Sequence, residues 1–287
     1  MAAARRGENS DGVTRLRFLI VVVLALVAAP AVAAEPAVTG YPSSMASTGD
    51  SITRAFNTCT FAFTDCPRNS WSTGTSSAVN SHYVRILAAN PGISGRNYND
   101  AVTGAEMSEL QGQVQRAVGQ GVEYVTILMG ANDACASSEA GMTPVETFRA
   151  QFAGAMASLS AGLPSARIYV VSVPDLYQLW DIYHDSFAAR TTWSLFGICQ
   201  SMLARPGSTA QADVDRRSRV RQRVIDYNAQ LANVCLAYVH CRFDGNAVFN
   251  YAFQPKDVST RDYFHPSREG QRILAAITWA AGYRFAP

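Results

Sequence analysis

The chain has 287 residues, of which 48% are hydrophobic and 16% charged, and its 24 basic side chains nearly balance its 22 acidic ones. This composition excludes an intrinsically disordered chain and is typical of one globular domain or two small ones. Because the net charge is close to zero and no run of basic residues is longer than two, we expect no nucleic acid partner.

The first 34 residues are predicted to be a secretory signal peptide. Basic residues, an apolar run and small residues follow one another in it: Arg15 and Arg17, then 18–29, then 31–34. We expect cleavage after Ala33 or Ala34, so that residues 35–287 form the exported domain and no membrane anchor remains. The alternative is an uncleaved anchor, but the apolar stretch is shorter than the roughly 20 residues that span a bilayer. We therefore expect a secreted protein.

Along the rest of the chain, apolar runs alternate with stretches of helical periodicity. Three runs are predicted to be buried strands: Ser43–Thr48, Tyr124–Met129 and Arg167–Val173. Four stretches are predicted to be helices: Met107–Val118, Pro144–Leu159, Val214–Ala237 and Ser267–Trp279. This alternation predicts an α/β fold with a parallel sheet covered by helices on both faces. The aromatic segment 175–211 interrupts it, and we expect an excursion over the edge of the sheet.

The six cysteines are even in number, which suits an oxidising compartment better than buried free thiols would. Two pairs lie close in sequence and two cysteines remain: Cys59 with Cys66, Cys235 with Cys241, and then Cys135 and Cys199. Proximity favours these three disulfides, although six cysteines allow many other pairings. Zinc is disfavoured, because no C-x-x-C pair occurs and the four histidines are scattered.

Three polar clusters lie where predicted strands end or where the last helix begins. Gly49-Asp50-Ser51 follows the first strand, Gly130-Ala131-Asn132-Asp133 follows the second, and Asp262-Tyr263-Phe264-His265 precedes the last helix. In an open parallel sheet, the ligand crevice lies beyond the carboxyl ends of the strands. The clusters therefore bring candidates for a nucleophile, a hydrogen-bond donor and a base to one crevice.

Together with Gly104, these clusters resemble the four signature blocks of the SGNH, or GDSL, hydrolases, in the order that the family has. The cysteine pairs and the segment Val173-Pro174-Asp175-Leu176-Tyr177 resemble secreted actinobacterial lipases and esterases of this group. The resemblance implies a flavodoxin-like, three-layer α/β/α fold and hydrolysis of carboxylic esters. It implies no cofactor and no metal, and a small-molecule or lipid ester as substrate. We expect a monomer.

The chemistry of the residues agrees with a serine esterase. The Ser51 hydroxyl is a weak nucleophile unless a base takes its proton, and His265 is our candidate base. The D-x-x-H spacing lets Asp262 reach the other ring nitrogen of His265, which selects the tautomer and stabilises the imidazolium. By resemblance, the oxyanion donors are the backbone N–H groups of Ser51 and Gly104 and the side-chain amide of Asn132. A glycine at 104 would let the backbone approach the reacting oxygen closely.

Other polar and aromatic residues are predicted to have structural roles. Asp50 and Asp133 are expected to brace turns, and His82, His184 and His240 to be surface or core residues. The aromatic stretch 177–196 is expected to serve packing rather than an acyl pocket.

Two alternatives to an esterase or lipase remain open. A carbohydrate O-acetylesterase would have an open, polar cleft, whereas a lipase would have apolar walls around Ser51, which the aromatic segment favours. A non-catalytic extracellular binding protein could use the same fold, but it would not need Ser51, Asp262 and His265 together. The motifs of α/β-hydrolases, zinc proteases and nucleotide-binding loops are absent from the sequence.

Overall fold

The structure, a computed structural model, describes residues 38–286, and the predicted signal peptide of residues 1–34 lies outside them. Five parallel strands form the central sheet in the order β3-β2-β4-β5-β6. They span Met45–Gly49 (β2), Asn97–Asn99 (β3), Tyr124–Leu128 (β4), Arg167–Val170 (β5) and Cys241–Phe243 (β6). This is the flavodoxin-like order, in which the chain switches direction between β2 and β4.

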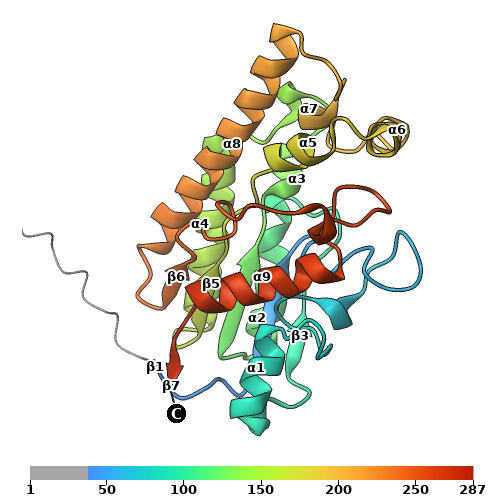
Figure 1. Cartoon of the computed structure of the whole chain (residues 1–287). Coiled ribbons are helices and arrows are strands. Elements are labelled where there is room, and N and C mark those ends of the chain that lie inside the picture. The colour runs from blue at the N-terminus through green and yellow to red at the C-terminus, as the bar shows by residue number, and fades with distance from the viewer. Residues whose placement is uncertain (1–37, 287) are drawn as a thin grey trace, which may run out of the picture. The chain divides into compact units, whose positions relative to one another are not determined.

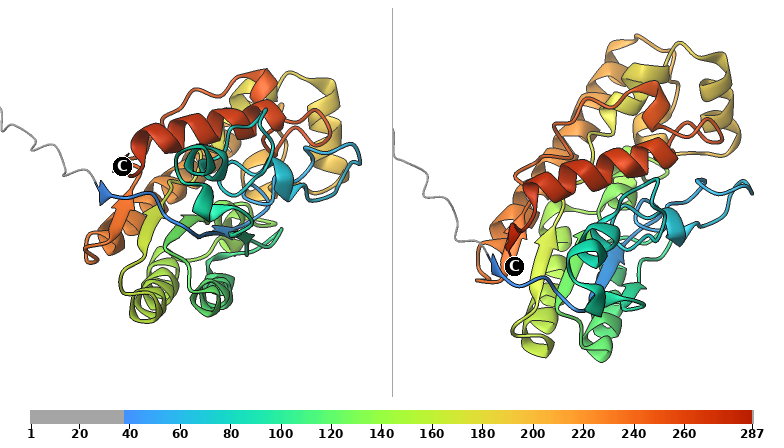
Figure 2. Two further views of the ribbon diagram at one scale, coloured as in Figure 1. Left: turned by 90° about the horizontal axis from the view of Figure 1, so that it is seen from below. Right: turned by 60° about the horizontal axis from the view of Figure 1, so that its bottom comes forward.

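Helices cover both faces of the sheet, as Figures 1 and 2 show. On one face lie α2 (Leu110–Gln120), α4 (Val145–Gly162) and α8 (Gln211–Cys235), and on the other lie α1 (His82–Ala89) and α9 (Arg268–Ala281). The predicted three-layer α/β/α fold is therefore confirmed. A short second sheet pairs β1 (Val38–Thr39) with β7 (Phe285–Ala286) in parallel. Within the described residues, no helix has the length and apolar character needed to cross a membrane.

The central strands follow from their sequence. All five side chains of β4 are buried, as expected for a strand covered by helices on both faces. The predicted helices are present with their boundaries shifted by a few residues; α9, for example, begins after Ser267, whose side chain accepts a hydrogen bond from the backbone of Gly270 at 3.1 Å. The two edge strands, β3 and β6, were not predicted, because each has only three residues and no long apolar run.

The aromatic segment lies in a different place from the predicted one. It forms α5 (Tyr177–Tyr183), α6 (Phe187–Leu195) and α7 (Gln200–Leu203), which Figure 1 shows beyond the carboxyl end of β5 rather than over the edge of the sheet. The chain leaves β5 at that end, and α5 and α7 pack against α8. This insertion therefore lies on the side of the sheet where the crevice is expected.

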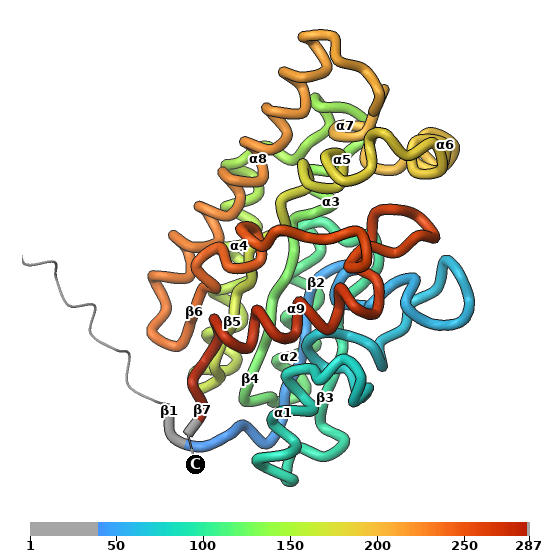
Figure 3. The backbone as a smooth tube through the Cα atoms, in the orientation of Figure 1, coloured from blue at the N-terminus to red at the C-terminus, as the bar shows by residue number. Residues whose placement is uncertain are grey.

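Three disulfides join the cysteines in the pairing favoured by the sequence: Cys59 with Cys66, Cys135 with Cys199, and Cys235 with Cys241. The second of these links the insertion to the end of the short helix α3 (Ala131–Ala134), which follows β4. Figure 3 shows that the loop containing Cys59 and Cys66 also lies beside the chain that leads into α9. Both excursions are thus attached beyond the carboxyl ends of the strands.

Candidate active site

Ser51 lies in a tight turn directly after β2. Gly49 ends the strand with φ +145°, and a Cβ there would lie 2.2 Å from the carbonyl oxygen of Leu128 on the neighbouring strand, so only glycine fits. The buried Gln113 of α2 holds this peptide on both sides. It accepts from the Gly49 N–H at 2.7 Å and donates to the Gly49 carbonyl at 2.9 Å. The turn that carries Ser51 is therefore tied to both the sheet and a helix.

Asp50 braces this turn from inside, as expected. Its Oδ1 accepts the backbone N–H of Ile52 at 2.8 Å, while its Oδ2 has no hydrogen-bond partner among the described residues. The side chain is completely buried, and burial raises the pKa of Asp50 to about 7, with a further contribution from the charge of Asp133. Near neutral pH, a neutral carboxylic acid is therefore substantially populated next to Ser51.

Because of this raised pKa, we expect Asp50 to make the protein less stable as the pH rises from about 4 to about 7. In that window the folded state keeps the proton that the unfolded state, with a pKa of 3.8, has released. Asp50→Asn should remove up to roughly 4 kcal/mol of this pH dependence. Urea unfolding with intact disulfides at several pH values measures it, and Asp185→Asn, whose side chain is 95% exposed, is the control. An unchanged slope in Asp50→Asn would contradict the expectation.

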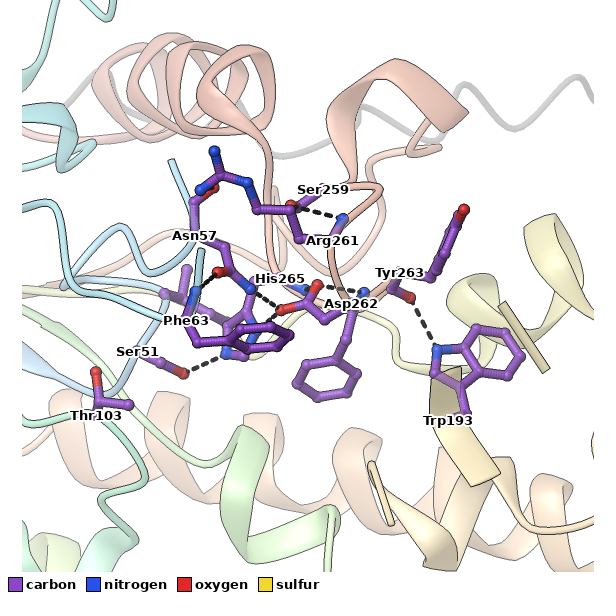
Figure 4. Close-up of polar contacts among 12 residues, drawn as sticks. Ser51, Asn57, Phe63, Thr103, Trp193, Ser259, Arg261, Asp262, Tyr263 and His265 are labelled. Carbon is purple, nitrogen blue, oxygen red and sulfur yellow. Dashed lines mark hydrogen bonds and ion pairs between the residues drawn. The ribbon is translucent and has the colours of Figure 1, made fainter. Parts of the chain in front are cut away.

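The structure brings Ser51, His265 and Asp262 into one hydrogen-bonded chain, drawn in Figure 4. The Nε2 of His265 lies 2.7 Å from the Oγ of Ser51, and its Nδ1 lies 2.7 Å from the Oδ2 of Asp262. The ring of Phe56 packs against the imidazole at a centroid distance of 4.8 Å, and that of Phe264 at 5.1 Å. With Nδ1 donating to the carboxylate, Nε2 is free to accept the serine proton.

The carboxylate of Asp262 is buried and surrounded by donors. Its Oδ1 accepts the backbone N–H groups of Phe264 and His265 at 3.0 and 3.1 Å, and its Oδ2 also accepts the side-chain amide of Asn57. Burial raises the pKa of Asp262, but the hydrogen bond and positive charge of His265, together with the backbone N–H groups of Phe264 and His265, outweigh burial and bring the pKa below its ordinary value. Asp262 therefore remains an anion facing the imidazole.

The predicted oxyanion donors lie on segments that follow β2, β3 and β4. Within residues 38–286, neither the backbone N–H of Ser51 nor that of Gly104 donates a hydrogen bond. The Nδ2 of Asn132 donates to the carbonyl of Ala105 at 2.9 Å, which uses only one of its two N–H groups. Gly104 has φ +84°, and a Cβ there would meet nothing within 4 Å. Its left-handed backbone conformation by itself favours glycine.

An apolar pocket opens beside His265. Residues of the Ser51 turn, the start of the insertion and the chain before α9 line it, among them Ile52, Leu176, Leu179, Phe253, Val258 and Phe264. The insertion thus contributes aliphatic side chains to the pocket. Two of its large aromatics serve packing, as predicted: Trp180 faces the guanidinium of Arg217 at 4.2 Å, and Trp193 is fully buried. Phe187 and Phe196 are instead 77% and 57% exposed.

Sequence reasoning missed the side chains that hold these segments together. The indole N–H of Trp193 donates to the carbonyl of Tyr263 at 3.1 Å, and Tyr263, between Asp262 and His265, has the left-handed φ of +54°. Similarly, the side-chain amide of Asn57 donates to Asp262, and that of Gln113 accepts the backbone N–H of Gly49. None of these three residues belongs to a spaced motif, so nothing in the local sequence distinguishes them from ordinary core residues.

The sequence profile of the GDSL-like lipase/acylhydrolase family matches residues 47–277 of the chain. No curated protein matches the chain. Among solved structures, it is similar to a variant of an acetyl-xylooligosaccharide esterase from Geobacillus stearothermophilus, with 16% identity over 83% of this chain and 93% of that one and a TM-score of 0.51.

Two lipases of known structure resemble the chain to a similar degree. An extracellular lipase from Streptomyces rimosus is 17% identical over 83% of this chain and 99% of that one, with a TM-score of 0.50. A lipase from a goat rumen metagenome is 12% identical over 84% of this chain and 97% of that one, with a TM-score of 0.52. At these identities the likeness shows a shared fold.

Proposed function

The chain belongs to the GDSL-like lipase/acylhydrolase family, and from this premise we propose that it is a serine esterase or lipase that cleaves carboxylic esters through an acyl-enzyme. The observation that carries the proposal is the pair of 2.7 Å hydrogen bonds from Ser51 through His265 to Asp262. No binding protein would need this arrangement of nucleophile, base and buried anion.

The proposed reaction has two halves. The Oγ of Ser51 attacks the carbonyl carbon of the ester while Nε2 of His265 takes the hydroxyl proton, and Asp262 stabilises the resulting imidazolium. The negative charge on the carbonyl oxygen would be bound by the N–H groups of Ser51, Gly104 and Asn132. His265 then returns the proton to the leaving alcohol. In the second half His265 takes a proton from a water molecule, the water oxygen attacks the acyl carbon, and the proton returns to Oγ of Ser51 as its bond to the acyl carbon breaks and the carboxylic acid leaves.

The apolar pocket beside His265 supports an apolar acyl chain as the preferred part of the substrate. Its lining is almost entirely apolar, from Ile52 next to the nucleophile to Leu179 and Phe253. A bound acetyl group would leave most of this surface in water, whereas each buried methylene contributes about 0.8 kcal/mol. These features favour an esterase or lipase over a carbohydrate O-acetylesterase.

We therefore expect kcat/KM for p-nitrophenyl esters to rise about fourfold with each methylene added to the acetyl ester, until the pocket is filled. Leu179→Trp should narrow the pocket and lower kcat/KM for the longer esters by at least about tenfold, with the acetyl ester little affected. Leu195→Trp, at a position that is 74% exposed on α6, is the matched control. Faster hydrolysis of an acetylated polysaccharide than of any longer ester would instead establish the O-acetylesterase.

We further propose that the protein is secreted as a monomer of the actinobacterial lipase type, with residues 1–34 removed as a signal peptide and 35–287 forming the catalytic domain. The three disulfides support an oxidising, extracellular location. The mass of the protein recovered from the medium of an expressing culture would identify the cleavage site.

A further inference from the structure

Asn57 is the long-range partner of the buried carboxylate. It lies 205 positions before Asp262 in the sequence, yet its side-chain amide donates to Asp262 Oδ2, the oxygen that also faces Nδ1 of His265. Figure 4 draws the contacts that Asn57 and His265 make with Asp262. Asn57 is 4% exposed and does not line the apolar pocket. It therefore reaches the reacting groups only through Asp262.

The contacts of Asn57 determine which of its terminal atoms faces Asp262. Its Oδ1 accepts the backbone N–H of Phe63 at 2.5 Å, so the amide nitrogen must be the atom directed at the carboxylate. Its own N–H donates to the carbonyl of Thr64 at 2.9 Å, and its φ of +66° is a left-handed value that asparagine tolerates better than most residues. The side chain is thus held as a donor before any substrate binds.

A second contact joins the same two segments in the opposite direction. The guanidinium of Arg261 donates to the backbone carbonyls of Asn57, Thr60 and Phe61 at 3.2, 2.9 and 2.8 Å. Thr60 and Phe61 lie in the loop that the disulfide between Cys59 and Cys66 closes, and Asn57 lies two residues before that loop. Asn57 therefore reaches Asp262 from a segment that Arg261, the neighbour of Asp262, holds in place.

We propose that Asn57 is a positioning residue for ester hydrolysis, which keeps Oδ2 of Asp262 aligned with the imidazole and shares its negative charge. The proposal rests on the catalytic roles proposed above for Ser51, His265 and Asp262. The Asn57 amide and the His265 ring both donate to Oδ2 of Asp262. The imidazolium is therefore stabilised by less than the full charge of the carboxylate. Removing the amide donor should therefore disturb the alignment of Asp262 with His265 and raise the proton affinity of His265.

Two variants separate these effects. Asn57→Gly removes the donor without straining the left-handed backbone, and we expect kcat to fall by about 10- to 100-fold with KM within about twofold. Without this donor, Oδ2 faces the imidazole with its full charge, so the acidic limb of the pH–rate profile should also move to higher pH. Asn57→Asp places a second carboxyl group against Asp262, and because two carboxylates in contact cannot both be ionised, the new group keeps a proton that can donate to Oδ2 in place of the amide. Its acidic limb should therefore stay close to that of the wild type.

The matched controls are Asn80→Gly and Asn80→Asp, because Asn80 also has a left-handed φ, of +54°, but lies exposed in the turn before α1. Wild-type kcat in Asn57→Gly, or a change confined to KM, would overturn the proposal. A lower kcat together with an unmoved acidic limb in Asn57→Gly would also overturn it, because a merely structural role predicts that result.

A measurement without turnover distinguishes this proposal from the proposed function. In a Ser51→Ala background, the titration of His265 followed by NMR should move to higher pH when Asn57→Gly is added, whether or not the protein hydrolyses esters. An unchanged titration would overturn the role of Asn57 alone. A shifted titration in a protein that hydrolyses no ester would leave that coupling intact and refute the proposed reaction.

Discussion

Replacing Ser51 with alanine is expected to lower kcat about a millionfold, because removing one member of a triad abolishes the function of the whole unit. The Ser51 Oγ makes a single described hydrogen bond, to Nε2 of His265, and no other side chain depends on it. The fold should therefore survive, with a melting temperature close to that of the wild type.

Hydrolysis of a p-nitrophenyl ester and a melting curve together measure this expectation. Ser218→Ala is a suitable control, because Ser218 is an exposed serine of α8 whose hydroxyl bonds only to the helix backbone, at 3.0 Å. Hydrolysis by Ser51→Ala at more than about a thousandth of the wild-type rate would mean that another group is the nucleophile.

Asp262→Asn is expected to lower kcat about ten-thousandfold, because it forces His265 into the wrong tautomer. The Oδ1 position faces the backbone N–H groups of Phe264 and His265, so the carbonyl of the new amide must lie there. Its NH₂ group then takes the Oδ2 position and donates to Nδ1 of His265. The ring proton moves to Nε2, which then donates toward Ser51 and cannot accept the serine proton.

In the same variant the new NH₂ group at the Oδ2 position would face the NH₂ group of Asn57, so two hydrogen-bond donors would lie against each other. We expect an added loss of stability of roughly 1 to 3 kcal/mol from this buried, unpaired donor. Kinetics measure the loss of kcat, urea unfolding measures the loss of stability, and ¹⁵N NMR of the imidazole identifies its tautomer. Asp185→Asn, whose side chain is 95% exposed, is the control. An Asp262→Asn variant with Nδ1 still protonated and kcat near the wild-type value would contradict the assignment of Asp262.

Much of the fold could be predicted from local patterns. The buried strand β4 is a continuous apolar run bounded by Gly121 and Gly130, and α9 begins at a serine cap. Where the pattern was weak, prediction was incomplete. The three-residue edge strands contain polar residues, and the helices of the insertion were mistaken for a covering of the sheet edge, because nothing local indicates where a chain goes after Pro174.

For this protein the sequence by itself determined the features that depend on short spacing: the turn after Gly49, the three-residue step from Asp262 to His265, and the class of fold. Only the tertiary structure decided which distant segments meet. The pocket beside His265, the indole of Trp193 on Tyr263 and the amide of Asn57 on Asp262 all join residues from different parts of the chain. A spacing of a few residues imposes a local geometry that can be read from the sequence, whereas a contact across two hundred residues exists only because the sheet and its packing bring the segments together.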